Sequence, residues 1–121
     1  MQTPQINVDR NGPVPTIELR VGQAHVGEFA TYLWTPTPTL VKAGPTDDVF
    51  NIGPSVQNLH GRLFTWNLGI QYQADGSKTY SATAVITQGE GTLYEEHYPD
   101  PPGQPMDGDV LIVRGVRFHV A

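Results

Sequence analysis

Apolar and polar residues alternate along most of this sequence, with the period of two that is typical of half-buried β-strands. The alternation predicts strands at residues 16–21 and 26–34, and the second of these has apolar residues at both parities. It predicts further strands at 48–52, 91–97 and 109–120. In the last of them Arg114 interrupts the apolar side. The chain is therefore expected to be all-β.

The longest alternation lies between residues 62 and 87. Apolar side chains occupy every second position, at Phe64, Trp66, Leu68, Ile70 and Tyr72 and again at Tyr80, Ala82, Ala84 and Ile86. Ala74-Asp75-Gly76 fits a three-residue hairpin turn with glycine as the left-handed residue. We therefore predict an antiparallel hairpin in which Trp66 faces Ala84. Its outer side would gather one uncharged polar face: Thr65, Asn67, Gln71, Thr79, Ser81 and Thr83.

Proline and glycine divide the rest of the chain into short pieces. Residues 1–15 contain three prolines and predict an extended arm or an edge strand. Residues 35–55 contain four prolines, which exclude a helix or a central strand and leave either proline-rich connections or a binding loop. For residues 16–121 we expect one antiparallel β-sandwich domain of six to eight strands, with a small β-barrel as the alternative.

Composition excludes several functions. The chain of 121 residues has no cysteine, so disulfides and thiolate chemistry are absent. Twelve acidic against seven basic residues give a net charge of −5, which disfavours nucleic acid as a partner. No apolar run is long enough to span a membrane, and no signal peptide is visible. We expect a cytoplasmic protein or one exported without an N-terminal signal.

Catalytic and metal-binding patterns are missing. The four histidines do not stand at ligand spacing, and no nucleophile motif or phosphate loop is present. Asp107 and Asp109 flank a glycine, which is typical of a turn that starts a strand, and calcium binding there is left open. We predict neither an enzyme nor a metal site nor a cofactor.

The uncharged polar face is the main functional signal. Exposed strands commonly carry Lys and Glu, whereas this face carries only hydroxyls, amides and Val85. Hydroxyls and amides both donate and accept hydrogen bonds, as sugar hydroxyls do. Trp34 and Tyr98 lie at predicted strand ends and would form an aromatic pole if those ends met. We expect a non-catalytic, lectin-like binding module for a neutral ligand such as a glycan. The alternative is an interaction protein that forms a homo-oligomer through the polar face.

Overall fold

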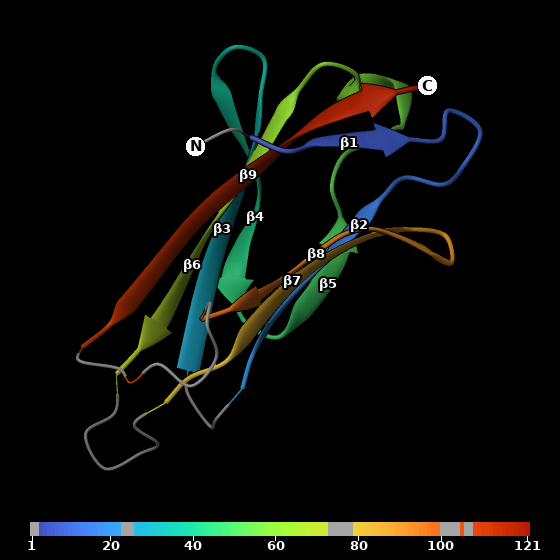
Figure 1. Ribbon diagram of the computed structural model, residues 1–121. Helices are drawn as coiled ribbons and strands as arrows, with labels where there is room; N and C mark the ends of the chain where they lie inside the picture. Colours follow the sequence, from blue (N-terminus) through green and yellow to red (C-terminus); the bar gives the residue numbers. More distant parts are fainter. Residues whose placement is uncertain (1–2, 23–25, 73–78, 100–104, 106–107) are drawn as a thin grey trace.

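The computed structural model describes residues 3–22, 26–72, 79–99, 105 and 108–121 (Figure 1). Within these residues the chain forms nine strands and one short 3₁₀ helix, and no helix there is long and apolar enough to cross a membrane. The elements are β1 (Gln5–Val8), β2 (Thr16–Val21), β3 (Val26–Trp34), β4 (Pro38–Pro45), β5 (Asp48–Asn51), η1 (Gln57–Leu59), β6 (Leu63–Gln71), β7 (Ala82–Gln88), β8 (Gly91–Tyr98) and β9 (Val110–Val120).

The strands form two sheets that pack face to face as a β-sandwich. One sheet has five strands in the order β1-β9-β6-β3-β4, and the other has four in the order β5-β2-β7-β8. Figure 1 shows the two layers side by side, with β1 beside the C-terminal half of β9. The sheets do not close into a barrel, so the predicted sandwich is confirmed. Neighbouring strands are antiparallel except β1 and β9, which are parallel.

The core lies between the sheets and follows the predicted alternation. Phe64, Trp66, Leu68 and Ile70 of β6 are buried, while the residues between them are only partly buried. On β7 the buried residues are Ala82, Ala84 and Ile86. Burying a large apolar side chain contributes about 1.5–3 kcal/mol, so these residues determine which side of β6 and of β7 faces the core. The predicted orientation of both strands is confirmed.

The predicted hairpin of these two strands is wrong. Strand β6 pairs with β3 and β9 in the five-stranded sheet, whereas β7 pairs with β2 and β8 in the other sheet. Its expected turn at residues 74–76 lies outside the described residues. Period-two alternation specifies which side of a strand faces the core. It is satisfied equally when β6 and β7 pair in one sheet and when they lie in two facing sheets. The connection therefore crosses from one sheet to the other instead of returning to the same one.

The proline-rich segment 35–55 contains two edge strands. Strand β4 begins and ends on proline and lies at the edge of the five-stranded sheet, paired only with β3. Strand β5 lies at the edge of the four-stranded sheet, paired only with β2. Edge positions tolerate proline because one side of the strand makes no ladder. The segment thus extends both sheets, and β4 was not predicted.

Candidate ligand-binding face

The predicted polar face is divided between the two sides of the sandwich. Thr65, Asn67 and Gln71 lie on the outer side of the five-stranded sheet, because they alternate with the buried residues of β6. Thr83 alternates with the buried residues of β7 and lies on the outer side of the four-stranded sheet, and Ser81 precedes that strand. Thr79 forms an isolated bridge with Pro105. These six residues therefore do not form one surface, because β6 and β7 belong to different sheets.

The predicted aromatic pole is not formed either. Trp34 ends β3 and pairs with Leu63, whereas Tyr98 ends β8 and pairs with Ala82. The Tyr98 side chain enters the core, where its hydroxyl lies 3.4 Å from Trp66 Nε1, whereas Trp34 lies on the outer side of β3. Tyr98 is also buried, with 5% of its surface exposed. Trp34 alone joins the outer face that contains Thr65.

Trp34 contacts that face directly. Its indole Nε1 donates to Thr65 Oγ1 at 2.9 Å, so the half-buried ring extends from β3 toward β6. We call the outer side of the five-stranded sheet the front face. Four of the eight predicted site residues lie on it, namely Trp34, Thr65, Asn67 and Gln71.

Two neighbouring rows across the front face carry no charge. The strand registers place the members of each row side by side from β4 to β9. One row contains Ala43, Ala30, Asn67 and Val113, and the next contains Leu40, Tyr32, Thr65 and Gly115. The rows combine small and aliphatic side chains with one amide, one hydroxyl and one phenol. The centre of the front face is thus neutral.

The outer side of the four-stranded sheet has a different character. Glu18 and Arg20 form an ion pair of 2.9 Å there, and His97 Nε2 lies 2.9 Å from Glu95 Oε2. Charged side chains of this kind keep an exposed sheet solvated. The two outer surfaces of one small domain therefore differ, and the front face is the better candidate for a partner.

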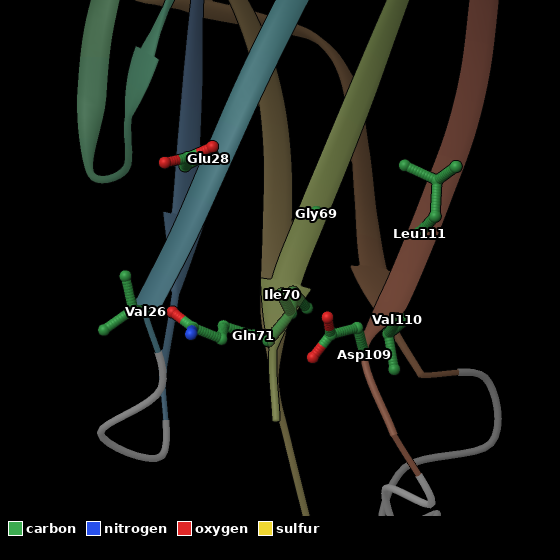
Figure 2. A pocket seen from close by; sticks show the side chains of 8 residues that line it. All are labelled: Val26, Glu28, Gly69, Ile70, Gln71, Asp109, Val110 and Leu111. Carbon is green, nitrogen blue, oxygen red and sulfur yellow. The ribbon is translucent and has the colours of Figure 1, made fainter. Parts of the chain in front are cut away.

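A hollow of about 480 Å³ opens on the front face where β6 has no side chain, at Gly69. It is lined by β3, β6 and the start of β9: Val26, Glu28, Gly69, Ile70, Gln71, Asp109, Val110 and Leu111. Figure 2 shows the Gln71 carboxamide on one side of β6 and the Asp109 carboxylate on the other, with Leu111 further along β9. Gly69 pairs with both Glu28 and Leu111, so the floor of the hollow lies between a carboxylate and an aliphatic wall.

One of the three polar side chains of the hollow, Asp109, is held by a backbone hydrogen bond. The backbone N–H of Tyr72 donates to Asp109 Oδ1 at 2.7 Å, which fixes this carboxylate beside the end of β6. In the part of the chain that the structure describes, Glu28 and Gln71 have no protein hydrogen-bond partner for their side chains. Two carboxylates and one amide thus stand beside Val26 and Leu111. Such a site can hydrogen-bond hydroxyl groups while its aliphatic wall packs against a C–H surface.

A second hollow of about 440 Å³ lies at the other end of the front face, beside Trp34. Its lining combines this aromatic ring with basic groups and the start of β6: Trp34, Thr35, Pro36, His60, Gly61, Arg62, Leu63 and Arg117. The two neutral rows separate it from the hollow over Gly69. An extended ligand on the front face would therefore meet acidic groups at one end and basic groups at the other.

Arg114 closes the side of the sandwich between β8 and β9. Its Nε donates to Glu96 Oε1 at 3.0 Å, and its guanidinium lies 5.5 Å from the centre of the Tyr98 ring. The Tyr94 hydroxyl donates to Glu96 Oε2. Burial raises the pKa of Tyr98 to about 12, and burial together with the Glu96 hydrogen bond raises the pKa of Tyr94. These four side chains satisfy one another, so we assign them a structural role.

Metal-binding geometry is missing from the described part of the chain, where no three His, Asp or Glu side chains cluster. Asp107 lies outside the described residues, and Asp109 accepts the Tyr72 N–H. His60 and His119 stack with ring centres 5.0 Å apart, but His60 Nδ1 accepts the Val120 N–H at 3.0 Å. A neutral His60 that bound a metal through Nε2 would carry its proton on Nδ1. Nδ1 cannot carry that proton while it accepts the backbone N–H of Val120.

Comparison of this chain with protein-family models, with curated proteins and with solved structures finds no match. The argument for function therefore depends on the front face itself.

Sequence reasoning did not select Glu28, Gly69 or Leu111 as site residues, and it considered Asp109 only for calcium. One signal was present, since a glycine inside a strand often marks a close approach of another group. Gly69 stands in the most regular alternation of the chain. The other three residues come from β3 and from the start of β9, and only the strand order places them beside β6.

Proposed function

We propose that this domain is a non-catalytic binding module that holds a neutral, hydroxyl-rich ligand, of which a glycan is the best candidate, on its front face. The observation that carries the proposal is the hollow over Gly69, where Glu28, Gln71 and Asp109 stand beside Val26 and Leu111. Carboxylates and amides accept and donate the hydrogen bonds that sugar hydroxyls offer. Aliphatic side chains cover the less polar face of a sugar ring.

The neutral rows support an extended ligand. Thr65 and Asn67 continue the line of polar groups from Gln71 along β6, and Tyr32 and Trp34 flank it on β3. Placing a neutral ligand on neutral rows avoids the desolvation of charged side chains, which is costly when they lose water without a partner. The hollow over Gly69 would bind one sugar unit, and the rows would contact the units that follow.

Substitution of Gly69 tests this proposal without disturbing the fold. An added Cβ at Gly69 would lie 3.9 Å from the Glu28 carbonyl oxygen, which is an ordinary contact. Gly69→Val therefore fills the hollow while it improves strand propensity, for an expected gain of about 0.5–1 kcal/mol in stability. Gly91→Val on β8 is the matched control, since its Cβ would lie 3.6 Å from the Gln88 carbonyl oxygen on the other sheet.

The measurement is an array of neutral oligosaccharides, followed by titration of the strongest hit with detection by NMR. We expect wild type and Gly91→Val to bind alike, and Gly69→Val to bind at least about tenfold more weakly, a loss of about 1.4 kcal/mol. Failure of wild type to bind any neutral oligosaccharide at about 10 mM would refute the proposal. Equal binding by Gly69→Val would refute the assignment of the hollow.

Homo-oligomerisation through the sheet face remains the alternative function, because neutral rows also lack like-charge repulsion between copies. Asn67→Lys distinguishes the two. Loss of an oligomer on Asn67→Lys, measured by light scattering with no sugar present, would favour face-to-face association over ligand binding.

A further inference from the structure

Strand β9 has an open edge along the half that includes Val110 and Gly115. One side of β9 pairs with β6 from Val110 to Arg117, but β1 covers the opposite side only from Arg117 to Val120. Among the residues that the structure describes, no strand pairs with this opposite side between positions 110 and 116. Figure 1 shows this half of β9 at the margin of its sheet, beyond the N-terminal start of β1.

The backbone groups that point to the open edge can be identified from neighbouring hydrogen bonds. Phe118 N donates to Arg62 O at 3.0 Å and Gly61 N donates to Phe118 O at 2.9 Å, so even-numbered residues of β9 direct these groups toward β6. Arg117 N donates to Pro4 O at 2.9 Å, so odd-numbered residues direct theirs the other way. Since successive residues of a strand alternate, the N–H and C=O groups of Leu111, Val113 and Gly115 face the open edge.

Other edges of the sandwich are protected against strand addition. Strand β4 begins and ends on proline, and β8 carries Glu95, Glu96 and His97. Strands β1 and β5 are only four residues long. Short length, proline and charge are the usual means by which proteins keep edges from pairing.

Arg114 is the one charged residue in the open half of β9, where its Nη1 donates to the Val113 carbonyl oxygen at 2.9 Å and its Nε to Glu96 on the other sheet. The open half is nevertheless less protected than the other edges, because it has no proline and is longer than β1 and β5. It begins with the uncharged sequence Val-Leu-Ile-Val at positions 110–113. Leu111 is 69% exposed and Val113 is 52% exposed, beside the backbone groups that face the edge. An edge that combines these features is favourable for the addition of another strand.

We propose that a second copy of this chain pairs with this edge, β9 against β9 in antiparallel orientation, with Ile112 at the two-fold axis. In this register Leu111 lies opposite Val113 of the partner subunit, so each copy covers the exposed apolar side chains of the other. Odd-numbered residues lie opposite odd-numbered ones, and every N–H that faces the edge finds a C=O. The Val113 carbonyl oxygen already accepts from Arg114 Nη1 and uses its second lone pair for the partner. Arg114 lies opposite the partner's Val110 and Asp109 opposite the partner's Gly115, so no like charges face each other.

The position of β1 selects this register. A shift that centred the pairing on Val113 would place the partner's Asp109 beside Arg117, where Gln5 already pairs. Centring on Ile112 instead uses the edge up to Gly115 and stops before β1. The result is one continuous sheet across two copies, with both hollows over Gly69 on the same side. This contact uses the outer edge of β9 and shares Asp109, Val110 and Leu111 with the lining of the hollow over Gly69.

Sedimentation of the full chain over a range of concentrations tests the proposal. An edge contact buries little surface, so we expect a reversible dimer that dissociates at micromolar concentrations. Val113→Lys should weaken it at least about tenfold. Val49→Lys is the matched control, because Val49 is 51% exposed on the edge strand of the other sheet. That variant should sediment as wild type does.

Val113→Pro separates the edge contact from general effects of charge. The Val113 N–H faces away from β6, so proline removes a donor from the open edge without breaking the β6 ladder. We expect a folded monomer, and in wild type we expect slow hydrogen exchange of the Leu111 and Val113 amides that speeds up on dilution. A wild type that stays monomeric at about 1 mM overturns the proposal, and so does a dimer that survives both substitutions at Val113. Protection of these amides only by an added foreign strand peptide would assign the edge to another protein instead.

Discussion

The indole N–H of Trp66 donates to the phenolic oxygen of Tyr98 at 3.4 Å and so links the two sheets through the core. Trp66 comes from β6 and Tyr98 from the end of β8, and both are buried. Tyr94 packs its ring edge-on against Trp66 with centres 6.0 Å apart. A buried indole N–H without a partner is costly, so Tyr98 is what allows a tryptophan at this central position.

Trp66→Ala should lower the free energy of unfolding by about 3–5 kcal/mol, because it removes the largest buried side chain and leaves a cavity. Urea denaturation followed by circular dichroism measures the loss. Trp34→Ala is the matched control, since that indole is only half buried on the front face. If the two substitutions cost the same, Trp66 does not have the central role described above.

Tyr98→Phe should reduce the sensitivity of the fold to alkali. The raised pKa of Tyr98, about 12, means that the folded state holds the phenol proton more tightly than the unfolded state does. Its contribution of about 3 kcal/mol is therefore complete below pH 10 and is lost as the pH rises toward 12. Unfolding by urea at a series of pH values from 8 to about 11.5 gives the free energy of unfolding as a function of pH for wild type and for Tyr98→Phe.

Tyr98→Phe also leaves the Trp66 N–H without an acceptor, so the variant should be less stable than wild type at neutral pH. The informative quantity is the slope above pH 10. Part of the slope should remain, because the pKa of Tyr94 is raised as well. An unchanged slope in Tyr98→Phe would show that the buried phenol does not govern alkaline unfolding.

The position and inward side of each strand were more predictable than which strands pair with each other. Strands β2 and β3 have the predicted bounds, and the inward side of β6 is as expected, because side-chain burial is a property of each strand alone. Pairing depends on where the chain goes between strands, and the alternation of Trp66 and Ala84 fits either one sheet or two facing sheets. Arg114 interrupts the apolar pattern of β9 because it reaches Glu96 on the other sheet.

The candidate site was partly predictable for the same reason. An uncharged polar strand was visible in Thr65, Asn67 and Gln71, and these three residues do share the front face. Their supposed companions on β7 do not, because that strand lies in the opposite sheet. The hollow over Gly69 depends on β3 and β9 flanking β6, and that order cannot be derived from periodicity.

Lysine substitutions on the two outer surfaces should have different effects. Thr83→Lys lies on the four-stranded sheet, which already carries Glu18 and Arg20, so it should change stability by less than about 0.5 kcal/mol and leave ligand binding intact. Asn67→Lys should also fold, but it puts a charge in the neutral row and should weaken ligand binding. Calorimetric titration of both variants with the same oligosaccharide checks this. Weaker binding in Thr83→Lys alone would move the site to the other sheet.

The side-chain amide of Gln88 holds the loop that follows β1. Its Nε2 donates to the carbonyl oxygens of Asp9 and Pro13 at 2.8 and 2.9 Å, and its Oε1 accepts the Asp9 N–H at 2.9 Å. Gly12 allows this close approach, since a Cβ there would lie 2.7 Å from the Gln88 Nε2. One amide thus bridges two parts of the loop to the end of β7.

Gln88→Glu should lower the free energy of unfolding by about 1–2 kcal/mol at pH 7. One carboxylate oxygen keeps the bond from the Asp9 N–H, but the other takes the place of Nε2 and faces two carbonyl oxygens without a hydrogen to donate. A protonated carboxyl can donate one bond again. The folded state therefore favours the protonated form, the pKa of the new carboxyl is raised, and the variant should approach wild-type stability as the pH falls below about 4. Gln57→Glu, at an exposed position on η1, adds the same charge without these contacts and serves as the control. Urea unfolding at pH 7 and pH 4 gives the comparison. A deficit in Gln88→Glu that does not shrink at pH 4, or that Gln57→Glu reproduces, would mean that the loop is not held by the amide hydrogens of Gln88.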